Sequence, residues 1–274
     1  MRLWMGGIVL LGVLSQAQAE EYSKSYSVSG RPTVHVTVDD SRVRIVTVDT
    51  KQVAFNVSRE GPLDPLKIDS HQDGDRVEIS VLHKPGVQIN NTERHLTTVV
   101  HLPRDADLRV EATDGAITAS QLTGKIELES VDGAIHADAL KGDVRLHSID
   151  GAIELTQFDG HCDVSSTDGA LRAEGRFDSL RLVTTDGSVV AKVADGSKMT
   201  SAWQIRTVDG SVDVSLPHDF QANIDASTQD GRIKLAAPVT VQGEISKSRV
   251  RGTLNGGGPE LTLKSTDGSI RISN

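Results

Sequence analysis

Apolar and polar residues alternate with a period of two along most of the chain, as in the VHVTV stretch at 34–38. This alternation is typical of β-strands that bury one face, and no stretch shows a convincing apolar period of 3.6 residues. Ahead of residue 110 the strand-like stretches are 33–38, 43–46, 53–57, 76–81 and 97–102, with loops at 61–65 and 84–92. We therefore predict an all-β protein.

Asp-Gly pairs recur along the second half of the chain. Five of these pairs, beginning with Asp114-Gly115, follow one another at intervals of 18 residues, and Gly124, Gly142 and Gly160 lie midway between them. Each unit is thus two nine-residue halves, each a strand closed by a turn, and such self-similarity marks a solenoid. Gaps of 23, 21 and 37 residues follow, and the last gap, close to twice 18, predicts one turn without its marker. The glycines of the eight pairs in this repeat series are Gly115, Gly133, Gly151, Gly169, Gly187, Gly210, Gly231 and Gly268.

Residues 18 positions apart form columns, which predict that successive units stack in register. Two apolar columns are Ile117, Ile135, Ile153, Leu171, Val189 and Ile126, Val144, Cys162, Leu180. Because both halves alternate, we predict a single-chain β-solenoid or β-roll with two parallel sheets facing each other and about 18 residues per rung. A further inward column contains hydroxyls that can hydrogen-bond one another or the turn: Ser130, Ser148, Ser166 and Thr184.

An outward column tests this register independently, because nothing hydrophobic forces its residues into line. Its members alternate in charge: Glu127, Arg145, Asp163 and Arg181. Neighbours in such a column lie about 4.8 Å apart, so each charge meets its opposite. We expect Glu127 beside Arg145, and we expect the column to specify register more than it stabilises the fold.

The Asp-Gly turns have two open interpretations. Glycine takes the left-handed backbone region without a Cβ clash and aspartate accepts a nearby N–H, so turn geometry alone explains the pair. Alternatively, the stacked carboxylates bind divalent cations, although the Gly-Gly-x-Gly-x-Asp consensus of calcium-binding rolls is missing. The carboxylates of this candidate cation column are Asp114, Asp132, Asp150, Asp168 and Asp186.

The N-terminus has the features of a secretory signal peptide. Arg2 precedes an apolar run at 3–14, and Ala17-Gln18-Ala19 offers a cleavage site that leaves Glu20 first. We predict export to the periplasm, the cell surface or the medium, with no membrane span after cleavage. The predicted organisation is a signal peptide at 1–19, a β-rich cap at 20–110 and the Asp-Gly solenoid at 111–274, with 20–274 forming one continuous domain.

Composition narrows the classes of partner. The formal net charge of −9 argues against nucleic acid and anionic membrane. Aromatic residues make up only 3%, so an aromatic-lined sugar cleft is hard to build. Cys162 is the only cysteine and falls in an apolar column, so we expect no disulfide and a buried thiol.

Catalytic and metal-binding patterns are missing from the sequence. Phosphate-loop and Gly-x-Ser-x-Gly motifs do not occur, and His136, His147 and His161 fall at three different phases of the repeat. We predict a non-enzymatic binding or scaffold module without cofactor or metal, whose partner is an envelope or extracellular protein or glycan.

Two further possibilities follow from the irregular part and the end of the chain. The alternative function is a carbohydrate-active β-helix enzyme, a polysaccharide lyase or hydrolase, with its site around Trp203, His218 and Asp219. The strand at 269–272 precedes Asn274, and we expect it to be an uncapped edge that can pair with another chain or self-associate edge to edge.

The beginning of the repeat resembles a known family. Leu102-Pro103-Arg104-Asp105, followed by LRVEATDG at 108–115, looks like the corresponding motif of the bacterial putative-adhesin family of DG-repeat β-proteins, a domain of unknown function. Leu216-Pro217-His218-Asp219 repeats this motif. The resemblance covers about residues 30–274 and implies an extracytoplasmic β-solenoid, with no established reaction and no catalytic residues.

Overall fold

The computed structural model describes residues 19–60, 66–84, 96–236 and 242–274. These residues form 23 β-strands and no helix, which confirms the all-β prediction. No helix that could cross a membrane occurs in these ranges. The predicted signal peptide, apart from Ala19, and the predicted loops at 61–65 and 84–92, apart from Lys84, lie outside the described residues.

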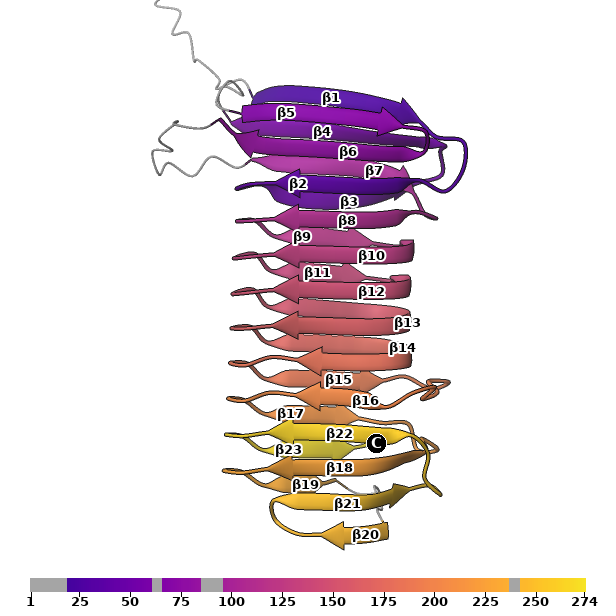
Figure 1. Cartoon of the computed structure of the whole chain (residues 1–274), viewed down its shortest axis with the longest axis vertical. Coiled ribbons are helices and arrows are strands. Elements are labelled where there is room, and N and C mark those ends of the chain that lie inside the picture. Colours follow the sequence, from indigo (N-terminus) through magenta and orange to yellow (C-terminus); the bar gives the residue numbers. More distant parts are fainter. Residues whose placement is uncertain (1–18, 61–65, 85–95, 237–241) are drawn as a thin grey trace, which may run out of the picture.

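The strands pair in two ladders that run along the long axis of the molecule (Figure 1). In spatial order the first ladder contains β5 (Leu66–Asp73), β6 (Arg76–His83), β2 (Thr33–Val38), β8 (Asp107–Ala112), β10 (Thr123–Ser130), β12 (Lys141–Ser148), the later halves of β13 (Ile153–Ser166) and β14 (Leu171–Val183), β16 (Trp203–Arg206), β22 (Glu260–Ser265), β18 (Ala222–Thr228), β21 (Arg249–Leu254) and β20 (Gln242–Ile245).

The second ladder lies beside the first and is joined to it through β13 and β14. In spatial order it contains β1 (Ala19–Ser27), β4 (Gln52–Glu60), β7 (Thr97–Pro103), β3 (Arg42–Val48), β9 (Ile117–Ser120), β11 (Ile135–Asp138), the earlier halves of β13 and β14, β15 (Val189–Val193), β17 (Val212–Ser215), β23 (Ile270–Ser273) and β19 (Ile233–Leu235). One passage through both ladders is called a rung below.

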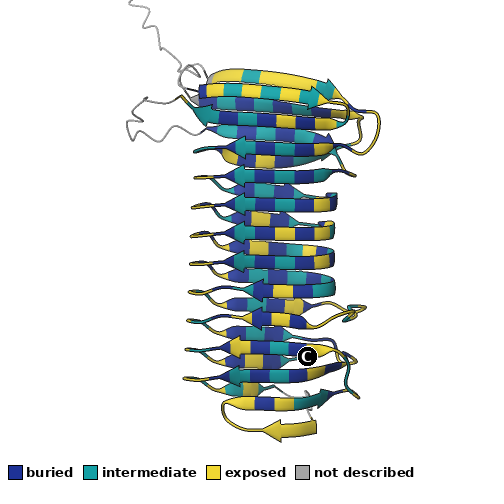
Figure 2. Cartoon of the chain, in the orientation of Figure 1, coloured by how far each residue is buried: buried dark blue, intermediate teal, exposed yellow. Residues whose placement is uncertain are grey.

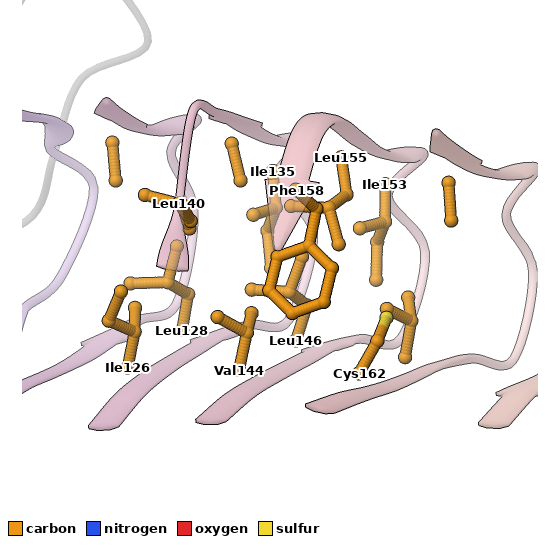
Figure 3. Packing of buried hydrophobic residues seen from close by; sticks show 14 of the residues in the cluster. Ile126, Leu128, Ile135, Leu140, Val144, Leu146, Ile153, Leu155, Phe158 and Cys162 are labelled. Atoms are coloured by element: carbon orange, nitrogen blue, oxygen red, sulfur yellow. The ribbon is translucent and has the colours of Figure 1, made fainter. Parts of the chain in front are cut away.

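The repeat region pairs in parallel with residues 18 positions apart. Glu127 lies opposite Arg145, and Ile135 lies opposite Ile153. Buried and more exposed positions alternate along the strands (Figure 2). In the inward columns, Ile126, Val144 and Cys162 are each at most 3% exposed and point into the space between the strands (Figure 3). Stacking in register therefore puts the apolar columns into one continuous core.

Antiparallel strand pairs close the N-terminal end of the stack. β5 pairs with β6 above the first ladder, and β1 pairs with β4 above the second. The five stretches expected before residue 110 all fall within strands, whereas β1 and β5 were not expected. Within the two ladders, β6 covers the edge of β2 and β7 covers the edge of β3, and both edges would otherwise expose unpaired N–H and C=O groups.

At the C-terminal end the order of rungs in space differs from their order in the sequence. β22 lies between β16 and β18, and β23 lies between β17 and β19. Figure 1 shows the C-terminus within the stack and β20 at its end. The prediction of an uncapped final strand at 269–272 is therefore wrong, because β23 has a parallel partner on both sides.

The gap of 37 residues before Asp267-Gly268 also has a different cause from the one expected. In the described part of this gap, residues 242–254 form the antiparallel hairpin of β20 and β21 in place of a rung, and β21 pairs with β18. The chain then returns to fill a position that lies one rung back. Two hairpin strands thus occupy the sequence that was assigned to a missing rung.

The glycines of the Asp-Gly turns stack on one another along one edge. A Cβ built on Gly151 would approach the carbonyl oxygen of Gly133 closer than 3.0 Å, a separation that Cβ atoms essentially never show, and the same clash recurs at each turn after Gly115. From Gly133 onward these glycines have no positive φ. The expectation that they adopt the left-handed region is therefore wrong for them, and close backbone approach is what requires glycine.

The inward hydroxyls bond the turns. Ser148 Oγ accepts the N–H of Gly151 at 2.9 Å and donates to the carbonyl oxygen of Gly133 at 3.2 Å. Thr184 Oγ1 likewise donates to the carbonyl of Gly169 at 3.1 Å. Of the two possibilities open at sequence level, the hydroxyls take the bond to the turn, and Ser130 and Ser148 each tie two successive turns together.

Replacing Gly151 by alanine tests the stacked turns. We expect Gly151→Ala to lower the free energy of unfolding by about 2–3 kcal/mol, because the new methyl group overpacks against the backbone of Gly133. Ala152→Ser is the matched control, since Ser188 and Ser211 fill the same turn position in later rungs, and it should change stability by less than about 0.5 kcal/mol. Urea unfolding measures both, and equal stability of Gly151→Ala and the wild type would contradict the stacking.

Candidate functional site

The side chains of the outward column of alternating charges form successive ion pairs along the first ladder. Arg109 and Glu127 are 2.7 Å apart, and Arg181 and Asp163 are 2.9 Å apart. Arg145 lies between the two carboxylates, 3.7 Å from Glu127 and 3.7 Å from Asp163. The expected contact between Glu127 and Arg145 is confirmed. Because the arginines of these pairs are 41–61% exposed, solvent screens each pair, which is worth at most about 1 kcal/mol.

A hollow of about 470 Å³ lies over this charged column, and we call it the ladder groove. One wall of the groove consists of Lys125, Asp143, His161 and Ser179, and the other consists of Glu127, Arg145, Asp163 and Arg181. Between the walls lie Ile126, Val144, Cys162 and Leu180, and Ala202 is added from the loop before β16. The groove crosses four successive rungs along the stacking direction. Its shape therefore suits an elongated ligand.

Arg109 forms ion pairs with three carboxylates at the N-terminal side of the groove. Its guanidinium is 2.6 Å from Glu111, 2.7 Å from Glu127 and 3.5 Å from Glu129. The hydrogen bond between Arg109 and Glu111 raises the pKa of Arg109 and lowers the pKa of Glu111. Both groups are therefore fixed charges at neutral pH, and the network ties β8 to β10.

The aspartates of the Asp-Gly turns form a second charged feature, the aspartate column, along the edge where the turns stack. Hydrogen bonding with Asp114 raises the pKa of Asp132, and hydrogen bonding with Asp186 and Asp267 raises that of Asp209. Asp40, outside the repeat, extends the column because it raises the pKa of Asp114 in the same way. Stacking in register thus brings like charges together here.

Potential metal ligands are dispersed over the molecule. In the described ranges no group of three or more His, Cys, Asp or Glu side chains is placed to hold a metal ion. His136 pairs with Glu154 at 3.7 Å, while His147 and His161 bond Ser165 and Ser179. The three histidines occupy different columns, as their phases in the repeat predict.

Trp203 belongs to an aromatic stack inside the core. Its ring lies 6.2 Å from that of Phe177 and 5.3 Å from that of Phe220, and Phe158 continues the stack 5.5 Å from Phe177. Trp203 is 1% exposed. It cannot stack against a sugar, so the enzyme site expected around Trp203, His218 and Asp219 loses its aromatic platform.

The other two residues of that alternative site lie in the loop between β17 and β18. Asp219 lines a hollow of about 410 Å³ together with Lys198, Met199 and Phe220. His218 Nδ1 lies 3.2 Å from the side-chain amide of Asn274 and is not part of this lining. The structure therefore does not bring the three residues to one surface.

Cys162 is buried beneath the ladder groove. It is 2% exposed, and burial raises the pKa of its thiol. The thiolate required for nucleophilic attack is thus disfavoured.

The chain belongs to the Toastrack DUF4097 family, whose profile matches residues 33–273. The resemblance seen at sequence level to a domain of unknown function thus resolves to this family, whereas a family defined by Asp-Gly repeats is not shown. No curated protein matches the chain.

Several solved structures resemble the chain over 93% of its length. One is a putative cell adhesion protein from Clostridium sporogenes (12% identity, 99% of that chain covered, TM-score 0.30). A putative adhesin from Bacteroides fragilis matches at 12% identity over 97% of its chain with a TM-score of 0.46. A protein from Parabacteroides distasonis named as a putative lipid binding protein matches at 13% identity over 97% of its chain with a TM-score of 0.43.

Neutralising one member of the aspartate column tests its electrostatics. The folded state raises the pKa of Asp132, so it binds protons more tightly than the unfolded chain, and stability increases as the pH falls toward that pKa. We expect Asp132→Asn to raise the Tm at pH 7, and we expect this gain to vanish as the pH is lowered into the range where Asp132 protonates.

Asp143→Asn is the control for this substitution, because Asp143 pairs in register with Lys125 and His161 rather than with other carboxylates. It should leave the Tm unchanged or lower it. Calorimetry across pH 4–8 measures both variants. A lower Tm for Asp132→Asn at pH 7 would show that the carboxylate contributes more to the turn than it costs by repulsion.

Proposed function

We propose that this protein is an exported, non-enzymatic binding or scaffold module of the cell envelope, and that it holds an elongated partner in the ladder groove. The observation that supports this most is the course of the groove across four rungs of a continuously hydrogen-bonded stack. The signal-like sequence at 1–19 supports export.

In this proposal residues 20–274 act as one continuous domain, with a cap at 20–110 and the repeat at 111–274. The two ladders face each other across the buried columns as sheets of a solenoid with about 18 residues per rung. The pairing of residues 18 apart and the burial of their inward side chains support this arrangement. Such a stack presents its groove in a fixed shape, which lowers the entropic cost of binding.

The lining of the groove favours a ligand that is bound through polar groups. Arg145, Asp163 and Arg181 satisfy one another's charge, so a bound partner need not supply a net charge. Among the residues that the structure describes, no Phe, Tyr or Trp lines the groove, and sugar rings therefore find no aromatic surface there to stack on. An extended protein segment fits this lining better than a glycan does.

We further propose that the aspartate column serves the turns and holds no divalent cation. Its backbone N–H groups bond the preceding rung, as Asp150 N–H bonds the carbonyl of Val131 at 2.9 Å. If the column instead binds calcium, millimolar calcium will raise the Tm of the wild type and chelation will reverse the shift. An unchanged Tm supports the structural role.

Two arginine variants test the groove as the binding surface. Labelled protein is probed against solubilised envelope proteins and against envelope glycans, and the Kd of any captured partner is measured for Arg145→Ser and Arg172→Ser. Arg145 lines the groove, whereas Arg172 pairs with Glu154 on the other ladder and serves as the matched control. We expect about a tenfold or greater loss of affinity for Arg145→Ser alone.

Equal losses for the two variants, or no partner from either source, would contradict this proposal. A glycan as the captured partner would overturn the preference for a protein segment while leaving the groove in place.

A further inference from the structure

The last rung of the chain fills a slot between two rungs that precede it in the sequence. We define the C-terminal rung as residues 259–274, which carry β22 and β23, and the slot as the space between the rung of β16 and β17 and the rung of β18 and β19. β22 pairs in parallel with β16 and with β18, and β23 pairs in parallel with β17 and with β19. Both sides of the slot are therefore open strand edges until the C-terminal rung arrives.

The C-terminal rung completes the core of this region. Leu261, Leu263, Ile270 and Ile272 are all 0% exposed. Leu261 lies in register with Trp203 on one side and Ile224 on the other. The slot thus selects a strand by its hydrogen-bonding edges and by its inward apolar side chains at the same time.

The turn of the C-terminal rung matches both neighbouring turns. A Cβ on Gly268 would clash with the carbonyl of Gly210, and a Cβ on Gly231 would clash with that of Gly268. Asp209 and Asp267 form a parallel bridge at the same level. The register of an incoming rung is therefore set by the glycine turn as well as by the core.

A glycine-rich hinge joins the C-terminal rung to the rest of the chain. Asn255, Gly256 and Gly257 have φ values of 49°, 90° and 82°, and Gly258 and Pro259 follow. The side chain of Asn255 bonds the carbonyls of His218 and Phe220 and anchors the start of the hinge. Three consecutive glycines allow the segment beyond the anchor to take more than one direction.

During synthesis, the strands on both sides of the slot are made before the C-terminal rung that fills it. Residues 203–235 precede the C-terminal rung, and the hairpin of β20 and β21 can pair onto β18 while residues 259–274 are still absent. Any chain that carries the sequence of the C-terminal rung then meets the recognition requirements of the slot. A second copy carries it identically.

We propose that the slot is a strand-exchange site, in which the C-terminal rung of one copy inserts into a second copy and the second copy returns its own. The partner of this surface is thus another molecule of the same chain. The exchanged dimer makes every contact of the closed monomer and differs from it at the hinge, which is the usual condition for domain swapping. This assembly does not depend on the ladder groove or on its ligand.

Two variants, each with one introduced cysteine besides the buried Cys162, detect the exchange. Ser215 in β17 and Ser273 in β23 are paired in register, and their hydroxyl oxygens are 3.0 Å apart. Full-length Ser215→Cys and Ser273→Cys chains are unfolded, mixed, refolded together at high protein concentration and oxidised. We expect a disulfide-linked dimer of one chain of each kind, in about tenfold or greater excess over dimers of like variants, because the slot holds the two thiols at high effective concentration.

The double variant S215C/S273C, refolded at low concentration, is the positive control and should close the disulfide within one chain. The wild type is the negative control, since its single thiol at Cys162 is buried. If the double variant closes and the mixed variants give no excess of the mixed dimer, the proposal is wrong.

Changing the hinge length gives a second readout on otherwise unaltered full-length protein. Deleting Gly256 and Gly257 shortens the path back into the slot of the same chain, so the ratio of dimer to monomer after concentrated refolding should rise in gel filtration. Inserting two glycines after Gly257 should lower this ratio. Equal ratios for the two hinge variants would overturn the proposal.

Discussion

Successive Asp-Gly turns lie with their backbones in direct contact, and the positions of all other columns follow from this contact. A side chain at Gly133 or Gly151 would collide with the carbonyl of the preceding turn, so only glycine permits the stack. The inward hydroxyls of residues such as Ser148 then bond two turns at once. Because side chains alternate along each strand, fixing the turn fixes which residues enter the core and which face outward.

This contact has opposite electrostatic consequences at different places around a rung. On the first ladder it sets Glu127 beside Arg145 and Asp163 beside Arg181, which favours the register. At the turns it sets aspartate above aspartate and raises the pKa of Asp132 and Asp209. The repulsion is tolerated because the carboxylates are exposed to solvent, which screens them, while the glycine contact beside them is buried in the stack.

Much of the regular region could be predicted from the sequence. The apolar columns and the alternating charges are independent signals with the same 18-residue period, and both correctly paired Glu127 with Arg145. The strands β1 and β5 were missed, since SKSYS and DSHQD are polar stretches whose strand form depends on partners elsewhere in the chain. Trp203 was assigned to a possible ligand surface because nothing in its own sequence neighbourhood shows the aromatic stack from Phe158 to Phe220.

The position of the C-terminal rung could not be predicted, because the repeated units are so alike that the sequence does not show their order in space. Every turn presents the same Asp-Gly backbone, so the rung at Gly231 and the rung at Gly268 fit equally well against Gly210 by sequence alone. The order of the last rungs in space follows from the hairpin of β20 and β21, which has no Asp-Gly turn and whose strand β21 pairs with β18.

Nuclear Overhauser contacts between the α-protons of the turn glycines test the stacking most directly. The account predicts contacts from Gly133 to Gly151 and from Gly268 to both Gly210 and Gly231. A contact between Gly210 and Gly231, with Gly268 remote from both, would contradict it.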